Sequence, residues 1–108
     1  MKLILAIIQN DDERALLSKL MREGYRATKL ATTGGFLRTG NTTVMIGIEE
    51  EKLNDVFGII HDTCRTRTVT MPSFPYAMEA GFHAVMPVET RVGGATVFVL
   101  PVEQKMNI

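Results

Sequence analysis

The chain has 108 residues, the size of a single domain, and 45% of them are hydrophobic, which is enough to fill one modest core. Its 12 basic residues balance 12 acidic ones, which excludes the broad basic surface that binds nucleic acid without regard to sequence. Cys64 is the only cysteine, so an intramolecular disulfide and a multi-cysteine metal site are excluded, and a reducing, cytoplasmic location is expected.

The first predicted element is a buried strand over residues 2–9. Its apolar run is too short for a signal-peptide core or a membrane span, and a polar stretch follows at once, so no membrane insertion is expected. Asn10 and Glu13 have the spacing of a capping box at the start of a helix. Gly24 has the position of the glycine that ends a helix.

Two further strands are predicted over residues 25–33 and 42–48, joined by a short glycine-bracketed loop at residues 34–41. In the later strand, apolar and smaller residues alternate, so Val44 and Ile46 share one face and Met45 and Gly47 the other. A second helix is predicted over residues 49–64. Its acidic start suits the positive end of a helix dipole, and apolar residues recur at helical spacing.

The last third of the chain predicts an arm followed by a final strand. Residues 65–71 alternate like an exposed strand, residues 72–82 suggest a long loop, residues 83–92 suggest extended structure, and residues 95–102 form another apolar strand. The order is therefore β-α-β-β-α-β with an arm before the last strand, which predicts one α+β, ferredoxin-like domain over residues 1–108. Both helices would cover one sheet face, and symmetry-related copies would cover the other.

Two runs of the sequence resemble the PII-like family of cyclic di-AMP receptors: KLATTGGFLRTGNTT at residues 29–43 and VGGATVFVLPVE at residues 92–103. The resemblance implies a ferredoxin-like homotrimer that binds cyclic di-AMP in clefts between subunits and acts as a signal transducer, not an enzyme. The short loop at residues 34–41 and the long one at residues 72–82 match the family pattern.

The resemblance also implies a set of ligand-binding residues. They are Arg26, Thr28, Gly35, Phe36, Leu37, Asn41, Gly47 and Phe98. Three features depart from the family: Gly24 replaces a frequent asparagine, Asn107 replaces a frequent glutamine, and residues 72–82 lack the usual paired glycines. These departures bear on ligand choice and on the partner more than on the fold.

The chemistry of these residues suits a ligand with two phosphates and two adenines. Arg26 and Thr28 share a strand face, and the planar fork of arginine pairs with phosphate. The backbone at Gly34 and Gly35 can approach an anion closely, and Phe36 can stack on an adenine. If Thr33 lies opposite Thr42, then Thr28 lies opposite Gly47, whose missing side chain leaves room for the ligand.

Each assignment has a structural alternative. The two glycines also fit a plain hairpin turn, Phe36 fits a loop anchor or a subunit contact, and Arg26 fits a solvated strand residue. Asn41 fits a left-handed turn equally well. Leu37 and Phe98 would be core residues by default.

The leading hypothesis is that cyclic di-AMP orders residues 34–41 and 72–90 and thereby changes the binding of an unidentified downstream protein. No cofactor is expected, and no metal, because two histidines and one cysteine lie far apart in the sequence. Two alternatives stay open: a PII-like trimer that senses ATP or another adenine nucleotide, and a small ferredoxin-like enzyme or interaction module that binds no nucleotide.

Overall fold

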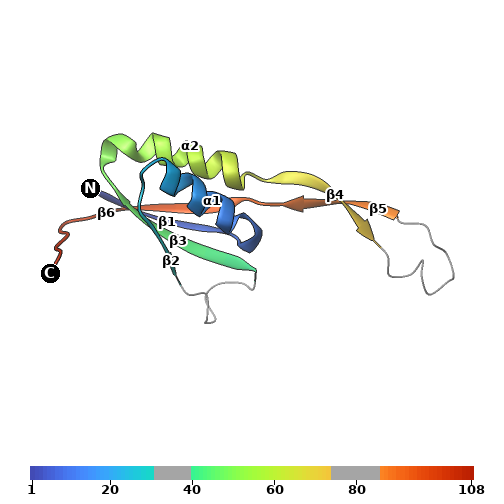
Figure 1. Ribbon diagram of the computed structural model, residues 1–108, viewed down its shortest axis with the longest axis horizontal. Helices are drawn as coiled ribbons and strands as arrows, with labels where there is room; N and C mark the ends of the chain where they lie inside the picture. The colour runs from blue at the N-terminus through green and yellow to red at the C-terminus, as the bar shows by residue number, and fades with distance from the viewer. Residues whose placement is uncertain (31–39, 74–85) are drawn as a thin grey trace.

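The computed structural model describes residues 1–30, 40–73 and 86–108 (Figure 1). Its elements in chain order are β1 (Lys2–Gln9), α1 (Asn10–Arg22), β2 (Ala27–Leu30), β3 (Asn41–Ile48), the 3-10 helix η1 (Glu50–Lys52), α2 (Leu53–Cys64), β4 (Arg67–Ser73), β5 (Met86–Val92) and β6 (Ala95–Pro101). This order is consistent with the predicted ferredoxin-like α+β fold, with the arm formed by β4 and β5.

The four-stranded sheet has the order β2-β3-β1-β6, and all of its neighbouring strands are antiparallel. β1 is central, because it pairs with β3 on one side and with β6 on the other. Figure 1 shows both helices on the same face of this sheet, as predicted. The two-stranded β4–β5 arm is a separate sheet that projects away from it.

The core lies between the helices and the sheet. Ile4, Ala6 and Ile8 alternate along β1 and are at most 1% exposed, as expected for one face of a strand with a period of two. They belong to the same buried cluster as Leu16 of α1 and Val56 of α2. Both helices therefore contribute apolar residues to a single layer of core.

The end of α1 confirms the predicted role of Gly24. This glycine has φ of +87°, and its amide donates to the Met21 carbonyl at 3.0 Å. The Tyr25 amide donates to the Leu20 carbonyl at 2.9 Å, which completes a Schellman motif. The helix stops here because glycine adopts the left-handed conformation without steric strain.

The predicted capping box at the start of α1 is wrong. Gln9 is the N-cap residue, and its side chain makes no capping hydrogen bond. The Asn10 side-chain oxygen accepts instead from the Thr42 hydroxyl, and Glu13 pairs with Lys29 at 2.9 Å. Strands β2 and β3 pass close to this helix end and supply partners that a local sequence pattern does not reveal.

Several predicted boundaries also differ. Asn41 opens β3 and does not close the preceding loop, and the 3-10 turn η1 precedes α2 where one continuous helix was expected. Residues 72–73 belong to β4, so the loop predicted over residues 72–82 is wrong at its start, whereas β5 lies within the extended structure predicted over residues 83–92. Pro72 lies opposite Pro87, which a two-stranded arm tolerates because each strand has an open edge.

The sheet face away from the helices, here called the open face, carries large apolar side chains. Leu5 lies opposite Phe98, and Leu3 lies opposite Leu100. Phe98 is 53% exposed and Leu100 is 40% exposed. Met45 continues the apolar surface onto β3, across from Leu5. The second apolar face predicted from the sequence is therefore present.

Candidate functional site

At one edge of the open face, the pairing of β2 with β3 differs in register from the prediction. Thr28 lies opposite Met45, and continuing the ladder places Arg26 opposite Gly47. The expected pairing of Thr28 with Gly47 is wrong by two residues, because the described ladder ends with Leu30 opposite Thr43. A shift of two residues keeps every side chain on its own face, so Arg26, Thr28 and Gly47 still share the open face.

A groove of about 620 Å³ lies at this edge. It is lined by strand residues of the open face together with residues from the chain ends and η1, namely Met1, Leu3, Gly24, Tyr25, Arg26, Thr28, Met45, Gly47, Ile48, Glu49, Lys52, Val102, Gln104 and Lys105. Three of the expected site residues therefore come together in one groove. Its lining combines apolar side chains with polar and charged ones, a mixture that suits a small-molecule site.

Gly47 keeps part of this groove empty. A Cβ atom added there would meet nothing closer than the Met1 Cε atom at 3.8 Å, an ordinary contact. Its backbone is not left-handed, because the glycines with positive φ in the described residues are Gly24, Gly40, Gly93 and Gly94. Neither packing nor backbone conformation in the described residues demands a glycine at position 47, and the missing side chain leaves open space in the groove.

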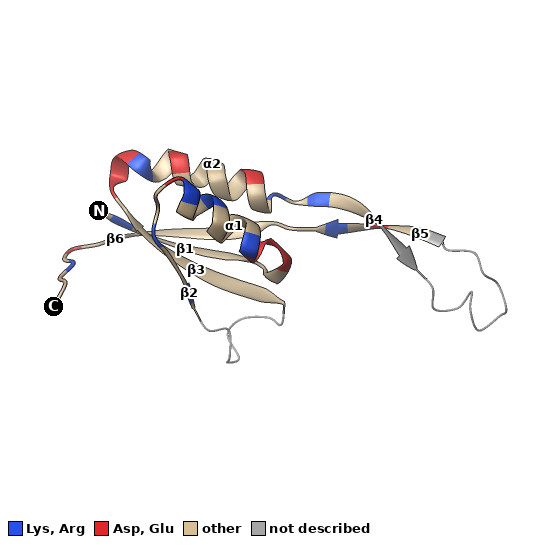
Figure 2. Cartoon of the chain, in the orientation of Figure 1, with Lys and Arg blue, Asp and Glu red and all other residues tan. Residues whose placement is uncertain are grey.

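The charge of the groove favours an anion. Arg26, Lys52 and Lys105 line it together with one carboxylate, that of Glu49. Among the salt bridges within residues 1–30, 40–73 and 86–108, none involves any of these three cations. Figure 2 shows that charged residues gather mainly on the helices, whereas the four-stranded sheet carries few.

Asn41 lies elsewhere. It pairs with Gln9 at the far end of β3, six residues from Gly47, which corresponds to roughly 20 Å along a strand. It lines a second hollow of about 380 Å³ with Gln9, Thr66 and Gly93 among its neighbours. The left-handed residue here is Gly40, with φ of +97°, so the turn alternative for Asn41 is wrong.

Phe98 is not a core residue. It points to the open face from β6 and is half exposed, and it lies outside the lining of both hollows. Gly35, Phe36 and Leu37 lie outside the described residues. The structure therefore brings together Arg26, Thr28 and Gly47, and it separates them from Asn41 within one chain.

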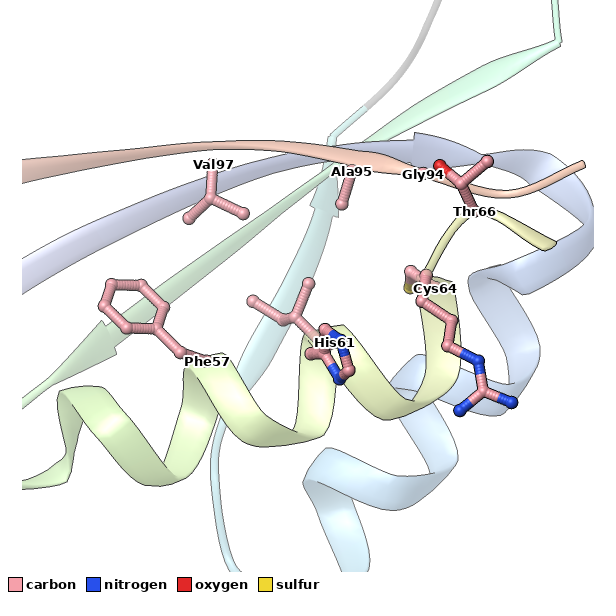
Figure 3. Close-up of a pocket in the computed structure, with 9 residues that line it drawn as sticks. Phe57, His61, Cys64, Thr66, Gly94, Ala95 and Val97 are labelled. Atoms are coloured by element: carbon pink, nitrogen blue, oxygen red, sulfur yellow. The ribbon is translucent and has the colours of Figure 1, made fainter.

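A third hollow, of about 530 Å³, lies between α2 and β6 (Figure 3). Phe57 and Val97 form its apolar end, Gly94 and Thr66 lie at the other end, and His61 lies between them. Cys64 is fully buried beside it, and burial raises the pKa of its thiol. In the described part of the chain, no group of three or more His, Cys, Asp or Glu side chains is placed to hold a metal ion.

Sequence reasoning missed the polar residues at the root of the arm. The guanidinium of Arg67 contacts both carboxylate oxygens of buried Asp12, at 2.6 and 3.3 Å. The Gly93 amide donates to the Gln9 side-chain oxygen at 2.7 Å. The glycine pair at Gly93 and Gly94 was a visible signal for a close approach, but nothing local marks the partners.

Fold and groove together define a ferredoxin-like α+β protein with an anion-compatible groove at a sheet edge. The chain belongs to the cyclic di-AMP receptor family, because the model of that family, described as "Cyclic-di-AMP receptor", matches residues 1–108. Its role in signalling through cyclic di-AMP follows from this membership.

The chain is also similar to a solved structure, that of a functionally unknown protein from Pediococcus pentosaceus ATCC 25745. The two are 46% identical with a TM-score of 0.79, over 99% of this chain and 96% of that chain. This similarity supports the fold over nearly the whole chain. Among the described residues, no helix is both long enough and apolar enough to cross a membrane.

Proposed function

We propose that this chain, as one domain over residues 1–108, binds cyclic di-AMP in clefts between the subunits of a homotrimer and signals to a downstream protein. The observation that carries the proposal is the family match over the whole chain. The protein acts as a sensor in the cytoplasm and catalyses no reaction. The residues of the groove support this role in the following ways.

Arg26 and Thr28 project from neighbouring positions on the open face and line the same groove as Gly47. In the proposal, the Arg26 guanidinium pairs with a phosphate, the Thr28 hydroxyl donates to it, and the space above Gly47 receives a base or sugar. Lys52 and Lys105 add positive charge to the rim. Such a groove complements a dianion that also carries apolar rings.

The groove is one half of the proposed site. Asn41 lies roughly 20 Å along β3 from Gly47, so a single ligand meets both only where two subunits adjoin. The exposed apolar side chains of the open face, with Phe98 among them, favour burial against neighbouring copies. Gly35, Phe36 and Leu37 complete the site in the proposal on the strength of the family resemblance.

Ligand binding would signal through the segment that joins β2 to β3 and through the β4–β5 arm. For binding to change these segments, the ligand must have a higher affinity for one of their conformations than for the other. The changed surface would then recruit or release the downstream protein.

Calorimetry with cyclic di-AMP tests the proposal directly. The wild type should bind, and Arg26→Gln should bind about tenfold or more weakly, because a hydrogen bond to a charged group is lost. Arg22→Gln is the matched control, since Arg22 is an exposed cation on α1 outside the groove lining. An absence of heat and of competition at roughly tens of micromolar ligand would contradict the proposal.

A second candidate ligand is ATP or another adenine nucleotide. Gly24 lines the groove at a position where the family often has asparagine, so this groove has more room and one amide fewer. Thermal shifts with cyclic di-AMP, ATP and ADP separate the candidates. Gly24→Asn should still fold, because asparagine tolerates a left-handed conformation, and a gain in cyclic di-AMP binding would assign the missing amide to that ligand.

A further inference from the structure

The first turn of α1 makes polar contacts in two directions. Toward the start of β3, the Asn10 amide donates to the Gly40 carbonyl at 2.8 Å, and the Thr42 hydroxyl donates to the Asn10 side chain. Glu13 accepts from the same hydroxyl at 3.4 Å. Thr42 is only 1% exposed, whereas Asn10 is exposed and Glu13 is half-buried, so these contacts are shielded from water on the Thr42 side.

Glu13 also binds the strand on the other side of the segment that joins β2 to β3. Its second carboxylate oxygen lies 2.9 Å from the Lys29 ammonium on β2. Both flanks of that segment, Lys29 before it and Gly40 after it, are thus attached to the start of the same helix.

Toward the arm, the same turn makes a second set of contacts. Gln9 accepts from the Gly93 amide at 2.7 Å, and Asp12 holds Arg67 by two bonds. Charge-assisted bonds that use both carboxylate oxygens fix orientation as well as distance. Both flanks of the arm, Arg67 at the start of β4 and Gly93 after β5, are therefore attached to this turn as well.

The backbone at the root of the arm is closely packed against its neighbours. A Cβ atom on Gly93 would lie 2.4 Å from the Arg65 carbonyl oxygen and 2.7 Å from Arg67 Nη1. The Gly94 amide donates to the Cys64 carbonyl at 2.5 Å, which attaches the root to the end of α2. Because the root is close-packed, a displacement of Gly93 moves its neighbours with it.

We propose that residues 9–13 are a coupling element that joins the start of β3 to the root of the β4–β5 arm, so that a change at one alters the other. Gln9 and Asp12 are positioning residues in this scheme. The hollow that Asn41 lines lies between the start of β3 and the root of the arm, since Gln9 and Gly93 also line it. A ligand group placed in this hollow therefore borders the start of β3 and the arm root alike. The link to ligand binding rests on the proposed function, whereas the coupling itself is a property of the free protein.

Hydrogen exchange in the free protein tests the coupling, because two amides report on the two sides. The Gly93 amide reports the attachment of the arm, and the Asn10 amide reports the attachment to β3. Arg67→Gln should raise exchange about tenfold at both amides, although Arg67 does not contact Asn10 in the described residues. Lys19→Gln is the control, since it breaks an exposed ion pair at the other end of the same helix and should change neither amide.

A rise at Gly93 with no change at Asn10 would overturn the proposal, because the two attachments would then be independent. If Arg67→Gln fails to fold, Gln9→Leu decides, since it removes the acceptor of the Gly93 amide without leaving a buried charge unpaired. In that variant too, a rise confined to Gly93 counts against the coupling. Arg67→Lys, which keeps the charge, should restore part of the protection at both amides.

The same readout connects the element to the ligand. In the wild type, cyclic di-AMP should slow exchange at Gly93, and Arg67→Gln should lose most of this effect while it retains measurable binding. An equal slowing in both proteins would show that the arm responds without this turn, against the proposal. If the wild type does not bind cyclic di-AMP, the proposed function fails, and the exchange data of the free protein still decide the coupling.

Discussion

The Gly93 amide donates a hydrogen bond to the side-chain oxygen of Gln9 at 2.7 Å, across 84 positions of sequence. Gly93 has φ of +85°, and it approaches the Arg65 carbonyl so closely that any side chain would overlap with it. The position requires a glycine on both counts, conformation and space.

Gly93→Ala should therefore destabilise the protein by about 1–3 kcal/mol, from backbone strain and overpacking. Urea unfolding measures the change. Gly58→Ala is the matched control, because Gly58 lies within α2 with nothing within 4 Å of an added Cβ atom. That variant should gain about 0.5–1 kcal/mol through helix propensity. Similar losses in both variants would contradict the close packing at the arm root.

The buried thiol of Cys64 should make stability depend on pH in the alkaline range. Burial raises the pKa of this thiol in the folded protein. Above the unfolded pKa of about 8.5, the unfolded chain loses a proton that the folded chain retains. The stability linked to the protonated Cys64 thiol is therefore fully present below that pH, and it is lost as the pH rises through the pKa of the thiol in the folded protein.

Urea unfolding between pH 7 and pH 10 under reducing conditions checks this expectation. Wild-type stability should fall across the upper part of the range, and Cys64→Ala should show a smaller fall from a lower starting value, because the truncation leaves a cavity. The native thiol should also react slowly with a disulfide reagent. Parallel pH profiles for the two proteins would show that Cys64 does not titrate in this way.

Gly47→Val should block the groove without unfolding the protein. The added atoms start from a Cβ position with no neighbour closer than 3.8 Å, and valine suits a strand. We expect an unchanged thermal midpoint and a loss of cyclic di-AMP binding of about tenfold or more, since the proposed function places part of the ligand in the filled space. Gly58→Ala again serves as a control that should bind normally. Normal binding by Gly47→Val would exclude position 47 from the site.

The proposed trimer predicts that the open face is an interface. Phe98→Glu places a charge among exposed apolar side chains and should convert trimers to monomers in light scattering. Val88→Glu is the control, because Val88 is 46% exposed on the arm, away from that face. A monomeric wild type, or a trimeric Phe98→Glu protein, would argue against this arrangement.

The sequence alone was sufficient for the order of elements and for which residues share a face. Periods of two and 3.6 residues are local properties, and Gly24 ended α1 as its position implied. The predicted register of β2 against β3 was wrong by two residues. Register depends on where the hairpin between the two strands closes, and the spacing of residues along each strand does not reveal that point. The shared face survived this error because the shift was even.

The candidate site was predictable only in part. Arg26, Thr28 and Gly47 are close in sequence or on paired strands, and the structure confirms that they line one groove. Asn41 lies far from these three residues because it stands at the opposite end of β3 from Gly47. The predicted site grouped Asn41 with Gly47 without taking the length of this strand into account. Asp12 and Arg67 are 55 positions apart, and neither carries a local signal that names the other. Long-range polar pairs of this kind require the folded chain.

The position of β1 in the sheet has a consequence for synthesis. Lys2 lies opposite Pro101, and β1 separates β3 from β6, so among the described strands the central one is synthesised first and one of its two partners last. Until then one edge of β1 exposes unpaired backbone groups and apolar side chains. A nascent or truncated chain without β6 should therefore depend on chaperones and aggregate readily, in spite of possessing both helices and three of the four strands.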